Sequence, residues 1–342
     1  MRTIWKRILL FTVVLVVLLS AANAEPAVYV KHSATFYDAF DTVITYTSYT
    51  QTDEEFYEQY ALVEETMTRY HQIFDLYNGY EGVNNLYAVN QNAGQAPTPA
   101  EKELIDLLLL IREWRVSYGE CVNPALGSVL ALWHITRDET SVLPEREKLE
   151  EAAKHCDFDR VMVDAEAGTV SFEDPEIRLD LGATAKGYSA QLTADALTAR
   201  GVTHFILNAG GNVICGDAPL DGRVCWTVAL TDIDGTSTRE RLHMLEKSIV
   251  TSGDYQRFVT IDGERYHHLI DPNTLYPGRY MHAVSIICED SGLGDFLSTA
   301  AFLMPYEESR ALIESIDDCE AYWVLNDGSD YMTDGFAAYL VQ

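Results

Sequence analysis

The alternation of helical and strand-like segments is the feature that most constrains how this chain can fold. Residues 159–181 alternate between apolar and polar side chains, and residues 185–200 then have the apolar spacing of a helix that Gly201 ends. Further strand-like segments lie near 203–207, 212–215, 224–230, 247–250, 255–261 and 283–288. Short links between strands favour antiparallel pairing, because parallel strands need long crossovers. We therefore predict an α+β fold with a mostly antiparallel or mixed sheet and flanking helices, rather than a doubly wound parallel sheet.

The remaining segments follow the same rules. Asp53 is the predicted N-cap of its helix, and Pro124 is the predicted start of another. Hydrophobic residues make up 47% of the chain and charged residues 23%, which is typical of a globular protein and excludes a disordered chain. Helices are predicted at 53–77, 99–118, 123–133, 144–155, 297–304 and 306–316, and strands within 26–50, at 320–325 and at 336–341.

The first 24 residues have the pattern of an export signal. Three cations precede the apolar run Ile8–Leu19, and Ala22-Asn23-Ala24 fits a cleavage site. The run is shorter than the ~20 residues that a membrane span needs, although an uncleaved anchor is the alternative. We predict a signal peptide at 1–24, one domain at 25–342, and an extracytoplasmic location. No cysteine precedes Cys121, so the sequence excludes a lipid anchor on an N-terminal cysteine.

The chain is strongly acidic. It has 24 Lys and Arg against 53 Asp and Glu, a formal net charge of −29. Such a surface repels nucleic acid, whose binding begins with neutralisation of phosphates by cations. An anionic cofactor would therefore need a local cation or a metal ion.

Six cysteines are present and none forms a CxxC pair, so a zinc ribbon or a thioredoxin-type motif has no support. Cys215 and Cys225 flank a turn-rich segment and could face each other across a hairpin. Buried free thiols are the equally good alternative.

Four segments contain residues suited to chemistry. In Thr251–Pro277, the tight-turn pair Asp262-Gly263 separates two strands, the second ending at His267-His268. Neighbouring residues on a strand point to opposite faces, so one histidine can face a site as a general base while the other packs. A pair of surface histidines is the bland alternative.

The other three segments are weaker when each is taken alone. Leu179–Tyr188 reads as a strand, a glycine and a helix start, which offers free N–H groups and Lys186 to an anion. Phe205–Gly216 places two glycines between strands, either as a simple hairpin turn or as a close approach to a ligand. In Gly294–Ala301, Asp295 and Thr299 share one helical face and supply oxygen ligands suited to Mg²⁺, although a capping role is common for such residues.

Taken together and in order, these segments resemble the ApbE family of FAD:protein FMN transferases. Two upstream steps also match, at Phe40-Asp41-Thr42 and from Val122-Asn123-Pro124 to Leu132-Trp133, so the resemblance covers roughly residues 34–340. The matching segments are Asp180–Tyr188, Asn208–Asn212, Ser252–Arg257, His267–Pro272 and Asp295–Ala300.

The resemblance implies a cofactor cleft between two lobes and a reaction in which FMN passes from FAD to a Thr or Ser hydroxyl of a target flavoprotein, releasing AMP, with Mg²⁺ bound. It implies that His268 activates the acceptor hydroxyl. The implied metal site comprises Asp295, Thr299, the carbonyl of Ala183 and the adjacent Ser298. The implied FAD contacts are Phe40, Cys121, Val122, Asn123, Asp180, Lys186 and Ile270.

Two departures from the family pattern stand out. Phe40 occupies a methionine position, and Leu275 replaces a turn glycine in Thr274-Leu275-Tyr276-Pro277, so the loop after the histidines is expected to differ. Two alternative functions stay open: an FAD pyrophosphatase that uses water as acceptor, and a flavin-binding protein without turnover. Nucleic acid is not an expected partner. A membrane is expected only through an uncleaved N-terminal segment or a membrane-bound target.

Overall fold

The computed structural model describes residues 27–342, so the predicted signal peptide lies outside the described residues. Within 27–342, none of the helices is long and apolar enough to span a membrane.

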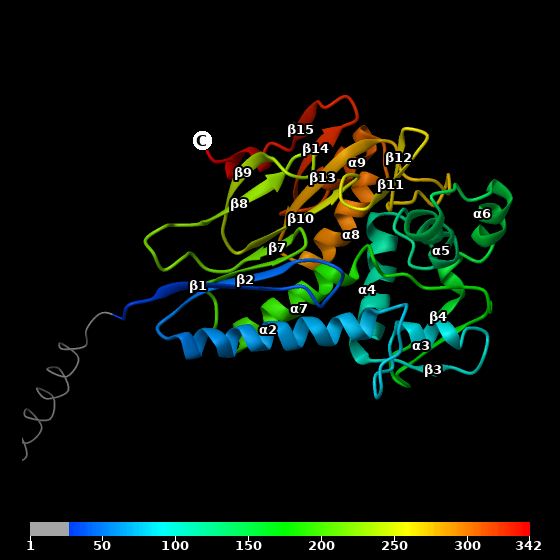
Figure 1. Ribbon diagram of the computed structural model, residues 1–342, viewed down its shortest axis with the longest axis horizontal. Coiled ribbons are helices and arrows are strands. Elements are labelled where there is room, and N and C mark those ends of the chain that lie inside the picture. The colour runs from blue at the N-terminus through cyan, green and yellow to red at the C-terminus, as the bar shows by residue number, and fades with distance from the viewer. Residues whose placement is uncertain (1–26) are drawn as a thin grey trace, which may run out of the picture.

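The central element is an eight-stranded sheet in which every neighbouring pair is antiparallel (Figure 1). Its middle strands are apolar, and Ile249 lies opposite Val213 on one side and Ile287 on the other. The predicted α+β fold with an antiparallel sheet is confirmed. The spatial order is β1 (Val30–Phe36), β2 (Ile44–Thr50), β6 (Phe205–Ala209), β7 (Asn212–Cys215), β10 (Lys247–Gly253), β13 (Met281–Cys288), β14 (Glu320–Leu325) and β15 (Asp330–Met332).

Helices cover one face of this sheet and a hairpin covers the other. The helices in contact with the strands are α2 (Asp53–Phe74), α7 (Ala185–Ala199), α8 (Ser291–Phe302) and α9 (Tyr306–Glu314). On the opposite face, the hairpin of β8 (Trp226–Thr231) and β9 (Thr238–Met244) and the 3₁₀ turn η3 (Phe336–Tyr339) enclose a second apolar cluster. The sheet is thus buried on both sides.

A second, mainly helical lobe lies beside the sheet lobe, to the right in Figure 1. A hairpin, β11 (Phe258–Ile261) and β12 (Glu264–His267), lies next to it, and its turn residues Asp262 and Gly263 both have positive φ, as predicted. The lobe contains α3 (Leu86–Gln91), α4 (Lys102–Tyr118), α5 (Gly127–Ile135), η1 (Thr136–Thr140), α6 (Arg146–Ala153), η2 (Phe158–Arg160) and a small sheet of β3 (Thr98–Pro99), β5 (Thr169–Phe172) and β4 (Val161–Asp164).

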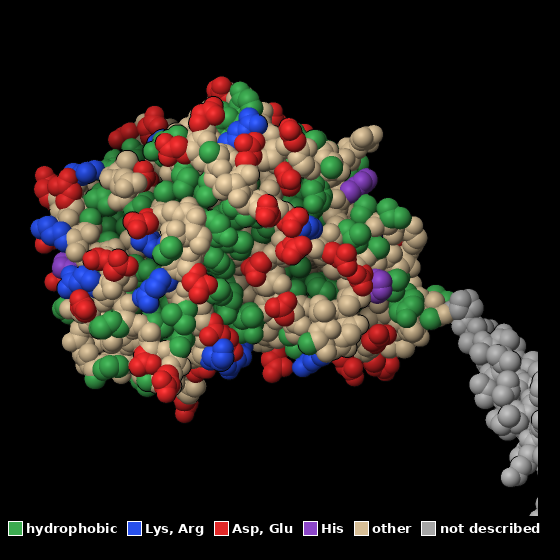
Figure 2. Space-filling view, turned by 180° about the vertical axis from the view of Figure 1, so that it is seen from behind, with side chains coloured by type: hydrophobic (Ala, Val, Ile, Leu, Met, Phe, Trp, Pro, Cys, Tyr) green, Lys and Arg blue, Asp and Glu red, His purple; other side chains and the backbone are tan. Residues whose placement is uncertain are grey.

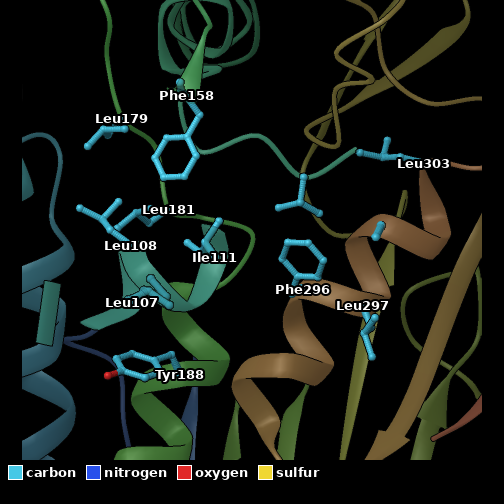
Figure 3. Close-up of a cluster of buried hydrophobic side chains, with 14 of the residues drawn as sticks. Leu107, Leu108, Ile111, Phe158, Leu179, Leu181, Tyr188, Phe296, Leu297 and Leu303 are labelled. Atoms are coloured by element: carbon cyan, nitrogen blue, oxygen red, sulfur yellow. The ribbon is translucent and has the colours of Figure 1, made fainter. Parts of the chain in front are cut away.

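One large apolar cluster joins the two lobes (Figure 3). Leu107 and Ile111 of α4 belong to it together with Tyr188 of α7 and Phe296 of α8. Burying each such side chain contributes about 1.5–3 kcal/mol relative to leaving it in water. Packing of these apolar side chains therefore fixes the first turns of α7 and α8 relative to the second lobe.

Three sequence-based boundaries were wrong because long-range contacts decide them. The helix predicted from Pro124 begins at Gly127, since the preceding turn pairs with 178–180: the N–H of Asp180 donates to Pro124 and that of Gly127 to Arg178. For the same reason 175–181 forms only an isolated bridge and no strand. The N-cap of α2 is Thr52 and not Asp53, because the Thr52 hydroxyl accepts the N–H of Glu55.

The end of the chain and the cysteines also differ from expectation. Residues 336–339 form a 3₁₀ turn where a strand was predicted. All six cysteines are unbonded thiols. Cys215 pairs with Ile206 and Lys247 in the central sheet, so the hypothesised hairpin between Cys215 and Cys225 does not form.

Candidate active site

A cleft of about 910 Å³ lies where the two lobes meet. Figure 2 shows acidic side chains spread over one face of the molecule. The cleft is lined by both signs of charge: the cations Lys186, Arg137 and Arg257, and the carboxylates of Asp41, Asp75, Asp180 and Asp295. Of the residues predicted for the site, all but Ser298 line this cleft: His268, Phe40, Cys121, Val122, Asn123, Asp180, Lys186, Ile270, Ala183, Asp295 and Thr299.

The starts of α7 and α8 form the floor of the cleft and pack without space between them. The N–H of Gly187, in the first turn of α7, donates to Oδ2 of Asp295 over 2.8 Å. A β-carbon at Gly187 would lie 2.3 Å from the carbonyl oxygen of Ser291 and 2.6 Å from Cβ of Asp295. Only glycine permits this approach, which places Asp295 against a free N–H at a helix N-terminus. Asp295 lies in the second turn of α8, because that helix spans Ser291–Phe302 and not 297–304 as predicted.

Two charged groups lie on this floor. Burial, aided by Arg257, lowers the pKa of Lys186, and the Asp295 carboxylate opposes this shift. Burial raises the pKa of Asp295, opposed by Lys186, the Gly187 N–H and the Asn212 amide. The Lys186 ammonium donates to Oδ1 of Asn212 on β7. A lysine in this place gives a local positive charge in a strongly acidic protein.

A cluster of hydroxyls lies beside Asp295. Oγ of Ser252 is 2.9 Å from Oγ of Ser298 and 3.3 Å from Oγ1 of Thr299. Ser298 is fully buried behind the cleft wall and its hydroxyl donates to the backbone oxygen of Asp295. The structure therefore brings Thr299 to the cleft and keeps Ser298 behind it.

These donors fit a magnesium ion. In the described part of the chain, no three His, Cys, Asp or Glu side chains gather as a metal site. The floor instead offers one carboxylate, the Thr299 hydroxyl and the Ala183 backbone, all oxygen donors beside the cleft. Mg²⁺ is commonly held in this way, by one or two carboxylates with water and substrate phosphates completing the shell.

His267 and His268 have different surroundings, although only His267 lies on strand β12. His267 is 3% exposed; its Nε2 donates to Gly278 over 2.7 Å and its Nδ1 accepts from Leu269. His268 lines the cleft, and its Nδ1 is buried without a hydrogen-bond partner. Burial and the nearby cations Arg257 and Arg137 lower the pKa of His268 to about 3, so its ring is neutral at physiological pH.

The backbone at the cleft edge is strained. Phe40 and Asp41 have φ of 57° and 48°, a left-handed conformation that costs a non-glycine residue about 1–2 kcal/mol. Two contacts hold it: Arg257 donates to both carbonyls, and the N–H of Phe40 donates to Nδ1 of His71. Next to it, Gly210 leaves no room for a β-carbon against Thr42. The double-glycine turn is thus a hairpin turn that also borders the cleft.

The other wall consists of backbone loops. The side-chain amide of Asn123 donates to the carbonyl of Cys156, which follows α6, and its Oδ1 accepts the N–H of Ala125, so it ties two loops of the wall together. Asp180 accepts the N–H of Gly182. Leu275, which replaces a turn glycine, has φ of 65°, and its carbonyl accepts from Trp133. The loop after the histidines therefore keeps a glycine-like conformation with a buried leucine.

Sequence reasoning missed several residues of this site. It assigned no role to Arg257, although this residue follows on from the Phe258–His267 pair of the β11–β12 hairpin and its carbonyl accepts the N–H of His268. It also missed Ser252, Asn212 and His71. The first two lie in motifs that were noticed, but only the fold shows that their side chains meet Thr299 and Lys186.

The sequence and the fold of this chain are similar to those of known proteins. The profile of the ApbE family matches residues 40–323. The FAD:protein FMN transferase of Treponema pallidum is 34% identical over 285 residues, covering 79% of this chain and 78% of that protein. The one from Klebsiella pneumoniae is 28% identical, covering 74% and 81%. The crystal structure of the ApbE protein from Thermotoga maritima superposes with a TM-score of 0.80 at 26% identity, over 92% of this chain and all of that one.

Proposed function

Because the chain belongs to the ApbE family, we propose that it is an FAD:protein FMN transferase. In this reaction the hydroxyl oxygen of a Thr or Ser in a target flavoprotein forms a bond to the phosphorus of the FMN half of FAD. The bond from that phosphorus to the AMP oxygen breaks, AMP leaves, and the hydroxyl gives up its proton. The products are FMN joined to the target by a phosphoester, and AMP.

The observation that carries the proposal is the convergence of three unlike groups in one cleft. A neutral His268, a cationic Lys186 and an oxygen-rich floor around Asp295 all line the same cavity. Cleavage of a pyrophosphate at a hydroxyl acceptor requires a base, a positive charge and a place for a divalent cation. A cleft made only for storage of a flavin would have no use for the base.

Each of the chain's own groups has a role in this scheme. The Lys186 ammonium binds the pyrophosphate, with the first turn of α7 behind it. The residues of the other wall, from Cys121 to Asn123 and at Asp180 and Ile270, enclose the rest of FAD. His268 accepts the proton of the acceptor hydroxyl. A bound pyrophosphate would favour the protonated ring and so would raise the pKa of His268.

Asp295, Thr299 and the carbonyl of Ala183 would hold Mg²⁺, which neutralises charge on the phosphates when it is bound. The Ser252 hydroxyl contacts that of Thr299, and Ser298 in turn contacts Ser252. We also propose that the enzyme acts outside the cytoplasm on exported flavoproteins, a location supported by the pattern of residues 1–24.

The test is to incubate the protein with FAD and Mg²⁺, with and without a domain bearing an acceptor Thr, and to follow AMP release and the mass of the acceptor. A mass gain of one FMN on the acceptor supports the transferase. AMP and free FMN in equal amounts, with no mass gain on any acceptor offered, would instead support the pyrophosphatase. Bound FAD without any AMP would contradict both.

A further inference from the structure

Asn212 is a buried amide between the two charges of the cleft floor. It is the first residue of β7 and is paired with Ala209 on β6 and with Val250 on β10, in the middle of the central sheet. It is 0% exposed and does not line the cleft, so it touches no substrate. A buried polar side chain without a structural task costs free energy, and therefore calls for an explanation.

The two ends of this amide face different partners. Oδ1 accepts from the Lys186 ammonium, which can only donate. Nδ2 is consequently on the other side, where it is buried without a hydrogen-bond partner. That side is the side of Asp295: a β-carbon at Gly187 would lie 2.8 Å from Nδ2 and 2.6 Å from Cβ of Asp295.

The direct alternative, a salt bridge between Lys186 and Asp295, is not formed. Among the ion pairs of residues 27–342, none joins these two groups, although each shifts the pKa of the other. Two opposite charges in a buried place attract each other strongly, and a lysine side chain is long and flexible. Something must hold the ammonium away from the carboxylate.

We propose that Asn212 is a positioning residue that keeps Lys186 and Asp295 apart, so that the ammonium stays available to phosphate and the carboxylate to a divalent cation. Only a side chain with an acceptor at one end and a donor at the other can face both charges at once. With the amide in place, the Lys186 ammonium has two further N–H donors to offer, and the Asp295 carboxylate is contacted by the neutral Gly187 N–H and Asn212 amide instead of by the ammonium. This inference rests on the proposed function, since it assigns the use of the ammonium and the carboxylate to FAD and Mg²⁺.

The test is a double-mutant cycle read by binding and not by turnover. Asn212→Leu keeps the number and branching of the side-chain heavy atoms and removes both polar ends, and Lys186→Met removes the ammonium. The Mg²⁺ concentration for half-saturation is measured from flavin fluorescence at saturating FAD, and the FAD Kd is measured without metal. In the wild-type background, Asn212→Leu should raise both values roughly tenfold, because Lys186 then pairs directly with Asp295.

In the Lys186→Met background, Asn212→Leu should change the Mg²⁺ value less than about twofold, because no ammonium remains to pair with Asp295. An equal loss in both backgrounds would mean that Asn212 only supports the fold, and would overturn the proposal. Unchanged affinities in the wild-type background would overturn it as well.

Ser309→Ala is the matched control for lost stability. Ser309 is also 0% exposed, and it accepts a hydrogen bond from Trp323 at the α9–β14 contact, outside the cleft. Ser309→Ala should lower the melting temperature and leave the affinities for FAD and Mg²⁺ unchanged. A loss of affinity equal to that of Asn212→Leu would overturn the proposal. A wild-type protein that binds FAD and Mg²⁺ but transfers no FMN would contradict the proposed function alone. The double-mutant cycle depends only on the two binding affinities, which could still be measured.

Discussion

The two sides of α8 show how differently the packed core and the cleft are built. On the core side, Phe296 and Ala300 are fully buried among apolar side chains, with no polar group left to satisfy. On the cleft side lie the residues that directly precede these two in the chain. Asp295 and Thr299 place a carboxylate and a hydroxyl at the surface of the cleft. Packing of the apolar side fixes the position of the helix. That packing, and not the hydrogen bonds of Asp295 and Thr299, therefore determines where these polar groups lie.

The neighbouring histidines repeat this contrast within two residues. Both nitrogens of His267 have partners, whereas Nδ1 of His268 has none. The same holds for the backbone, which is left-handed at Phe40 and Asp41 beside the cleft. The unpaired Nδ1 of His268 and the left-handed pair Phe40 and Asp41 therefore lie along the same cleft, where the proposed reaction would take place.

The largest effect is expected from His268→Gln. We expect transfer to fall about 10²–10⁴-fold, which is the usual contribution of general base catalysis, with FAD affinity nearly unchanged. The measurement is the rate of FMN attachment to an acceptor domain, with FAD binding measured alongside. His243→Gln, at an exposed position on β9, is the control and should be silent. Retention of transfer in the His268 variant would remove its role as the base.

The next prediction concerns His267, whose two ring nitrogens both have hydrogen-bond partners. Burial lowers the pKa of His267 to about 4 from 6.5, so the unfolded chain binds this proton more readily than the folded one. Its stabilising contribution is complete above pH 6.5 and is lost as the pH falls toward 4, by about 3 kcal/mol. Urea unfolding of the wild type and of His267→Gln at pH 7 and pH 4.5 measures this. Equal loss of stability in the two proteins would show that His267 titrates normally.

A smaller change is expected from Asp295→Asn. The amide oxygen can still accept the Gly187 N–H, so the junction of α7 and α8 should persist. Loss of the carboxylate should raise the Mg²⁺ concentration needed for half-maximal activity by about tenfold or more. Glu314→Gln, at an exposed position on α9, controls for the change in charge. An unchanged Mg²⁺ requirement would place the cation elsewhere.

The sequence predicts those elements of the fold that depend on residues close together in the chain. The periodicity of α7 and the Asp262-Gly263 turn were found because each depends on residues close together in the chain. β9 was missed because it is rich in charged and polar residues and only Leu242 and Met244 are buried. The start of α5 was misplaced because hydrogen bonds from a segment some fifty residues away decide it.

The sequence predicted most of the residues that line the cleft, but not how these residues are arranged in it. Motif resemblance identified residues that do line one cleft, yet it placed Ser298 among the ligands although the structure puts it behind the wall. It gave no role to Arg257 or Asn212. Their partners, Phe40 and Lys186, are far away in the chain, so only the folded structure relates them.

The smallest effect is expected at the far end of a helix that reaches the cleft. Thr52 caps α2, and its replacement by Ala removes the acceptor for the Glu55 N–H, at a cost of about 1 kcal/mol in unfolding free energy. The other end of α2 carries His71, which holds the strained Phe40. Between the ends, buried residues such as Val63 and Met67 fix the helix against the sheet. Thr52→Ala should therefore lower stability in urea without changing FAD affinity or transfer rate. A loss of FAD affinity would show that fraying at one end of α2 reaches His71, and that the cleft is less independent of the packed scaffold than the contrast across α8 indicates.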